Sequence, residues 1–395
     1  MTWSTSCSSR AARAVAIALL SAASAGAQEP AHGRVALFPV DNVSGGSAPL
    51  RELRGAIELA VASAGLEVVS GDAVEQFLAR HRVRYTGGVD GATAAQAGQE
   101  LGVEGVLLTS IELYTESPPQ LALTMRLAAA RSDATILWID GVSRSGIESP
   151  GLLGLGILTM QELQDRILAR LARSLAENVA GRGPRARACD DGGRFGPHVR
   201  YRSPILEAGQ IYSVAVVPFR NLTGRRSAGD LVTLEFLRQF AATDAFRVVE
   251  PGVIRDIVLR NRVVMEGGIS VDQVRLLLGA LGADLVVAGD VFDFAERAGS
   301  APTVNFSFAM LDGRTGEIAW ESTSVSSGDA RVWFFGLGTV RTAPALTCRM
   351  VRTVLEEMFR TAPPPGAVRR VAPEPVSPSG PRRGEYVPPR ERSPR

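Results

Sequence analysis

One pattern occurs twice in the chain, and this duplication constrains the fold more than any other feature. VALFPVDNVSG at 35–45 returns as VAVVPFRNLTG at 214–224, and LGVEGVLLTSIELY at 101–114 returns as LGADLVVAGDVFDF at 281–294. A repeat of about 150 residues has the length of a domain and is too long for a solenoid unit. We therefore predict two tandem copies of one domain.

The predicted copies span 33–180 and 211–362. Each reads as strand, helix, strand, helix, helix, three strands, helix, and the three strands of the first copy are expected at 104–114, 119–129 and 134–143. Helices alternating with strands, followed by a meander, favour a mixed sheet with helices packed on it. The predicted fold class is α/β, with the two domains packed face to face about a pseudo-dyad.

Three segments lie outside the copies. Residues 1–27 have a basic start, an apolar run and an Ala-Gly-Ala end, which is typical of a secretory signal peptide cleaved after Ala27. The Gly, Arg and Pro-rich stretch 181–210 is expected to be a linker. The tail 363–395, rich in Pro and Arg, is expected to be extended and disordered. These features predict an exported protein, periplasmic or associated with the outer membrane, with no transmembrane span.

Two cysteines remain after the signal segment, which carries Cys7. Cys189 lies in the expected linker and Cys348 in the last expected helix. They could pair in an oxidising compartment. Sequence sets no distance between them, so two unrelated thiols are the alternative.

No motif in the chain predicts catalysis, a cofactor or a metal site. A Walker loop needs Lys, which the chain lacks. The Gly-x-Gly at 154–156 and 336–338 lacks a dinucleotide-binding context and is interpreted as a flexible passage. The carboxylate pair Asp290/Asp293 does not recur in the first copy. None of the histidines has a second ligand at metal-binding spacing; they are His32, His81 and His198.

The repeated Asn-Val/Leu-Ser/Thr-Gly turn admits two interpretations. Ser44 and Thr223 could belong to an anion-binding nest, but we favour Asn, Ser and Thr side chains that satisfy free backbone donors near a helix start, with Gly easing the turn. Next to this turn the copies differ, because the first has Asp41 where the second has Arg220. These two residues are the candidate interaction positions if the copies meet different partners.

The charge balance argues against nucleic-acid binding. The body of the chain between the signal segment and the tail has slightly more acids than arginines, whereas a nucleic-acid binder presents a basic face. From residue 361 onward seven Arg stand against three Glu, so the tail could make a peripheral contact with the outer membrane or the cell wall.

The second copy resembles the envelope α/β domain shared by the curli-secretion channel CsgG, the penicillin-binding-protein activator LpoB and the amino-terminal domain of TolB. The residues that carry this resemblance are Leu281, Gly282, Ala283, Asp284, Asp312, Thr315, Gly316 and Trp320. The first copy keeps Trp138, but its nearby acid, Asp133, stands closer to that residue. The chain departs from the family in lacking a lipidated cysteine after the signal, a long inserted hairpin and a propeller.

The resemblance implies a non-catalytic protein that binds envelope proteins as a scaffold or regulator. A periplasmic ring subunit of a CsgG-like outer-membrane export assembly is the alternative. An enzyme is a third hypothesis, and it would need a cleft with converging polar residues.

Overall fold

The computed structural model describes residues 33–147, 159–189, 195–204, 206–207, 209–263, 271–296, 300–330 and 338–360. The predicted signal peptide with its cleavage site after Ala27, the Gly-x-Gly at 154–156 and the tail 363–395 lie outside these residues. In the described part of the chain no helix is long and apolar enough to cross a membrane.

The first copy forms a six-stranded sheet in the order β3-β1-β4-β5-β6, with β2 paired to β4. The strand β1 runs parallel to both β3 and β4, whereas β4, β5 and β6 form an antiparallel meander. The elements are β1 (Arg34–Leu37), β2 (Asp41–Asn42), α1 (Leu50–Ser63), β3 (Glu67–Val68), α2 (Gly71–Arg80), α3 (Gly91–Leu101), β4 (Gly105–Glu116), β5 (Pro119–Ala129), β6 (Ile136–Ser145) and α4 (Met160–Val179).

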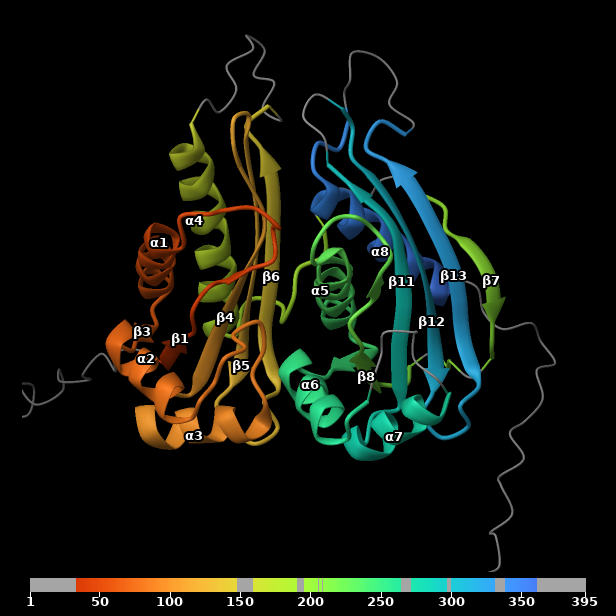
Figure 1. Ribbon diagram of the computed structural model, residues 1–395, viewed down its shortest axis with the longest axis horizontal. Helices are drawn as coiled ribbons and strands as arrows, with labels where there is room; N and C mark the ends of the chain where they lie inside the picture. Colours follow the sequence, from red (N-terminus) through yellow and green to blue (C-terminus); the bar gives the residue numbers. More distant parts are fainter. Residues whose placement is uncertain are drawn as a thin grey trace, which may run out of the picture. The chain divides into compact units, whose positions relative to one another are not determined.

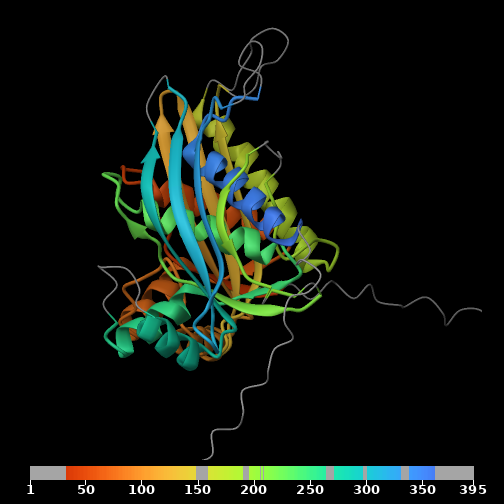
Figure 2. The same ribbon diagram turned by 90° about the vertical axis from the view of Figure 1, so that its right-hand side faces the viewer.

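The second copy repeats this topology and adds one strand. Its seven-stranded sheet has the order β10-β8-β11-β12-β13-β7, with β9 paired to β11. The elements are β7 (His198–Arg202), β8 (Tyr212–Val216), β9 (Arg220–Asn221), α5 (Ala228–Ala241), β10 (Phe246–Val248), α6 (Pro251–Arg260), α7 (Val271–Leu281), β11 (Leu285–Ala295), β12 (Thr303–Asp312), β13 (Ile318–Ser327) and α8 (Ala343–Arg360). The mixed α/β fold class is thus confirmed, and Figure 2 shows the long strands of this sheet side by side.

The stretch predicted as a linker, 181–210, contains regular structure. Its strand β7 pairs antiparallel with β13, whose backbone groups would otherwise form an open edge. Ala186 forms a bridge with Ile139 of the first sheet. The stretch is therefore tied to both copies, which the interpretation as a linker missed.

The expected pseudo-dyad is wrong, because the copies pack head to tail. The helices α5 and α8 of the second copy contact β6 of the first. Ile136 and Ile139 of β6 belong to the same apolar cluster as the core of the second copy. Figure 1 shows the order of layers: α1 with α4, the first sheet, α5 with α8, and the second sheet.

The reason lies in the sequence of α5. All of its residues except Asp230 are buried, and its apolar residues extend around more than one face, so this helix can pack between two sheets. The equivalent helix α1 buries only one face, through Leu53, Ile57 and Val61.

Candidate functional site

The two copies meet at an ion pair that is fully buried. Arg126 projects from β5, and its Nε lies 3.1 Å from Oε2 of Glu250, with both side chains 0% exposed. Arg126 also donates through Nη2 to the carbonyl oxygen of Gly87. The backbone N–H of Val89 donates to Glu250 Oε1 over 3.2 Å. Thus Glu250 of the second copy holds both a strand and a loop of the first.

Glu250 is available for this contact because it does not cap its own helix. In the first copy Ser70 is the N-cap of α2 and its hydroxyl accepts from Ala73 N. Glu250 is the N-cap of α6 but makes no side-chain cap bond. At this one position of the duplication, the first copy thus has a helix cap and the second has a contact between domains.

Glycine allows the close approach of the two backbones beside this ion pair. A Cβ added at Gly252 would lie 2.3 Å from backbone atoms of Val89, and one at Gly88 would lie 2.7 Å from Gly252 N. The atoms in the way belong to the backbone, which cannot move aside as a flexible side chain can. Both positions therefore need glycine.

Beside the ion pair lies a cavity of about 320 Å³ that both copies line. The first copy contributes Asp41, Tyr85 and Ser110, and the second contributes Asp230 and Arg255. The remaining wall is largely apolar and includes Val43, Pro218, Leu234, Leu237, Ile254 and Val258. A concave apolar space with a few polar groups is the usual form of a small-molecule site.

Burial raises the pKa values of three acidic groups in this cavity. It raises the pKa of Asp41, an effect that Arg126 opposes and Asp230 reinforces. It raises the pKa of Tyr85 to about 12. Burial also raises the pKa of Asp230, although this carboxylate is exposed enough for solvent to weaken the effect. The guanidinium carbon of Arg255 lies 4.4 Å from the centroid of the Tyr85 ring, a cation–π contact.

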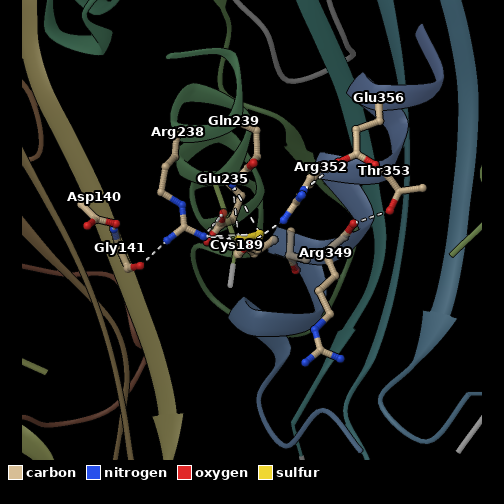
Figure 3. The surroundings of a disulfide bond; sticks show 12 residues. Asp140, Gly141, Cys189, Glu235, Arg238, Gln239, Arg349, Arg352, Thr353 and Glu356 are labelled. Atoms are coloured by element: carbon tan, nitrogen blue, oxygen red, sulfur yellow. Dashed lines mark hydrogen bonds and ion pairs between the residues drawn. A yellow bond between two sulfur atoms is a disulfide. The ribbon is translucent and has the colours of Figure 1, made fainter. Parts of the chain in front are cut away.

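A second polar cluster surrounds a disulfide between Cys189 and Cys348, whose Cα atoms are 6.0 Å apart. Figure 3 shows Arg238 of α5 reaching the carbonyl oxygen of Gly141 on β6, at 2.5 Å. Arg238 also pairs with Glu235 at 2.8 Å and donates to the sulfur of Cys348. The disulfide therefore sits where a buried cation of the second copy meets the first sheet.

The carboxylates near this disulfide predict how stability depends on pH. Burial raises the pKa of Glu235 to about 8, against an ordinary value of 4.5; Arg238 opposes the shift, and Glu112 adds to it. Burial also raises the pKa values of Glu112 and Asp140. Between the unfolded and folded values the folded state binds more protons, so stability falls as the pH rises.

We accordingly expect the free energy of unfolding to fall from about pH 5 to about pH 8. In the variant Glu235→Gln this fall will be shallower, since one of the responsible protons is gone. Urea unfolding at a series of pH values measures both slopes. Parallel curves for the variant and the unmodified chain would contradict the assignment to Glu235.

The outer face of the second sheet, opposite α5 and α8, is covered at one end by α6 and α7, which pack on Val217, Val286 and Leu311. Among the described residues the rest of this face, beyond these two helices, is open. In the first sheet Asp41, Ser110, Thr124 and Gly141 lie opposite one another across four strands, and they line the two cavities between the copies. The equivalent ladder of the second sheet consists of Arg220, Asp290, Ser307 and Thr323. The first three of these residues line a separate hollow of about 320 Å³. Phe292 and Val325, near this ladder, are 44% and 68% exposed. We call this surface the open face.

The two candidate interaction positions lie on different surfaces. Asp41 lines the cavity between the copies, whereas Arg220 lies on the open face and binds Asp290 through two bonds of 2.8 and 2.9 Å. Asp293 accepts instead from Thr303, so the carboxylates of Asp290 and Asp293 have separate partners.

The side chains of the repeated turn satisfy backbone donors, as expected, but these donors belong to the turn and not to the start of a helix. Asn42 Oδ1 accepts from the backbone N–H of Ser44, and Asn221 Oδ1 accepts from that of Thr223. The helices that follow have other N-caps, Pro49 and Ser227. The side chains therefore stabilise the turn itself.

The two described histidines and the tryptophans that recur in both copies have structural partners. His81 Nε2 lies 2.6 Å from Glu100 Oε1, and His198 begins the edge strand β7; His32 lies outside the described residues. Trp320 donates to Ser322, while Trp138 donates to Ser174. Among the described residues no group of three or more His, Cys, Asp or Glu could hold a metal ion.

Sequence reasoning missed Arg126, Glu250 and Gly252. The available signals were an arginine inside an otherwise apolar strand and a Glu where the other copy has the cap Ser70. Neither signal identifies the residue that Arg126 or Glu250 contacts, because this contact depends on how the copies pack.

No family model and no curated protein matches the chain. Three solved structures show weak likenesses. The PelC dodecamer from Paraburkholderia phytofirmans is 19% identical, with 40% of this chain and 96% of that chain covered and a TM-score of 0.28. Lipoprotein GNA1162 from Neisseria meningitidis is 18% identical, with 36% and 99% covered and a TM-score of 0.27. The LpoB C-terminal domain from Escherichia coli is 17% identical, with 29% and 82% covered and a TM-score of 0.21. Scores this low carry no argument about function.

Proposed function

We propose that this chain is an exported, non-catalytic cell-envelope protein that acts as a protein-binding scaffold or regulator. The observation that carries the proposal is the open face of the second sheet. In the first copy the part of this face beyond α2 and α3 is covered by a protein surface, the helices α5 and α8. The fold thus already uses this surface to bind helices, and in the described residues of the second copy the part beyond α6 and α7 is uncovered.

The occupant we propose is a helical surface of a partner protein in the envelope. Exposed Phe292 and Val325 supply apolar area, while Asp290 and Glu321 supply polar contacts at the edges of the hollow. Apolar side chains ringed by polar ones are the usual composition of a protein-binding patch. The proposed export is supported by the signal-peptide pattern of 1–27 and by the disulfide, since disulfides persist in oxidising compartments.

The ring alternative assumes that separate chains pack head to tail in the way the two copies do within one chain. Such a heterologous contact between chains generates rings or filaments. It would require α4 of one chain to cover the open face of another. The outward residues of α4 are charged, however, and include Glu162, Asp165, Arg166 and Arg173. Its counterpart α8 instead buries Pro344 and Cys348 between the copies. The scaffold proposal therefore ranks first.

A photo-crosslinking residue placed at Thr323 or at Arg166 tests the proposal in the intact envelope. We expect a defined protein adduct from position 323 on the open face and none from position 166 on α4. The further change Phe292→Asp should abolish the adduct at 323, because it puts a charge into the contact. Equal adducts at both positions would contradict the proposal, and an adduct between two copies of the chain would favour the ring.

A further inference from the structure

The cavity between the copies is a partly open site that the proposed scaffold function does not use. It is bounded on one side by the turn after β1 and the loop of Tyr85 and Gly87, and on the other by α5 and α6. At about 320 Å³ it falls at the small end of the range for ligand pockets.

The charges of its lining favour a cation. Two carboxylates, Asp41 and Asp230, face one guanidinium, that of Arg255, and Arg255 is already held over the ring of Tyr85. The nearby ion pair of Arg126 and Glu250 is neutral as a whole. Within the described part of the chain, the carboxylate of Asp41 has Arg126 as a charged neighbour but no hydrogen-bond donor.

The other part of the lining favours an aliphatic body. Leu234 and Leu237 of α5 together with Ile254 and Val258 of α6 provide an apolar wall, and these helices come from the same copy as Asp230. A ligand with a charged head and an apolar stem would place each end against a matching surface. An anion would instead face two carboxylates, and a neutral apolar molecule would leave Asp41 without a partner.

We propose that this cavity binds a small aliphatic amine, with the ammonium group at Asp41 and Asp230 and the hydrocarbon against α5 and α6. Because both copies line the cavity, such a ligand would stabilise the packing of the two domains by mass action. This proposal is independent of the open face, and its failure would leave the scaffold proposal standing.

Calorimetric titration of the full chain with hexylammonium tests the site. We expect saturable binding of this probe, with 1-hexanol at least about tenfold weaker and hexanoate weaker still. Asp41→Asn and Asp230→Asn should each weaken hexylammonium binding by about tenfold or more and leave hexanol unchanged. Hexanol binding as tightly as hexylammonium, or hexylammonium binding unaffected by both substitutions, would overturn the proposal.

A second pair of variants distinguishes the cavity from a general charge effect. Arg255→Gln removes the cation beside Asp230 and should tighten hexylammonium binding several-fold. The matched control Arg260→Gln lies on the same helix, where Arg260 pairs with Asp256 at 2.8 Å, and should change nothing. Equal effects of the two substitutions would contradict a site in the cavity. Thermal unfolding of each variant checks that it is folded, and Asp230 is exposed enough to tolerate substitution.

The pH dependence gives an independent readout. Asp41 and Asp230 lose protons at higher pH than ordinary carboxyls, and the charged groups that face them are Arg126, Glu250 and Arg255. Hexylammonium stays charged while these carboxyls titrate, so its affinity should rise with pH as they lose their protons. Affinity that is constant with pH would count against the two carboxylates as its binding groups.

Discussion

Replacing Glu250 with alanine will lower the free energy of unfolding by about 3–5 kcal/mol. The substitution leaves the guanidinium of Arg126 buried without its counter-ion, at a position where the side chain is 0% exposed. It also removes the acceptor of the Val89 N–H. Urea unfolding at neutral pH measures the loss, and the transition should begin with separation of the two copies.

The matched control for this prediction comes from the duplication itself. Ser70→Ala removes the equivalent N-cap of the first copy and should cost only about 1 kcal/mol. Replacing both Arg126 and Glu250 with Met should recover much of the loss, because no unpaired buried charge remains. If Glu250→Ala and Ser70→Ala cost the same, the buried ion pair does not hold the copies together.

Removing the disulfide is expected to have the second largest effect. Cys348→Ser should lower the free energy of unfolding by about 2–5 kcal/mol. The bond closes a loop with a sequence separation of 159 in a chain of 395 residues, so it restricts about two fifths of the unfolded chain. It also fixes the residues around Arg238, where α5 meets β6.

The disulfide prediction has two internal checks. Cys189→Ser should cause a similar loss, and the double variant should add little, because each change breaks the same bond. A reducing agent should destabilise the unmodified chain to the level of the variants and leave the variants unchanged. A chain whose unfolding does not respond to reductant would contradict the bond between Cys189 and Cys348.

Most of the fold could be predicted from the sequence because the duplication supplied each element twice. The meander strands expected at 104–114, 119–129 and 134–143 are β4, β5 and β6, with shifts of a few residues at their ends. The strand β7 was not predicted, because a five-residue edge strand can form with little apolar periodicity when β13 supplies the backbone hydrogen bonds.

The packing of the copies could not be predicted, although a signal was present. The sequence of α5 is apolar on more than one face, which indicates a helix between two layers. Periodicity alone does not say that the second layer is the sheet of the other copy. The cavity and the Arg126–Glu250 pair depend on that packing, so they could not be predicted either, whereas Asp41 was found because it differs from its counterpart Arg220.

The sheet surface around Thr124 of the first copy is covered by the second copy, whereas the equivalent surface around Ser307 is open among the described residues, and thiol labelling tests this difference most directly. Thr124→Cys and Ser307→Cys place a thiol at equivalent positions of β5 and β12, and peptide mass spectrometry follows the labelling rate of each. We predict that the thiol at position 307 is labelled at least about 100-fold faster, since labelling at 124 requires the copies to separate. Equal rates at the two positions would contradict the head-to-tail arrangement of the domains.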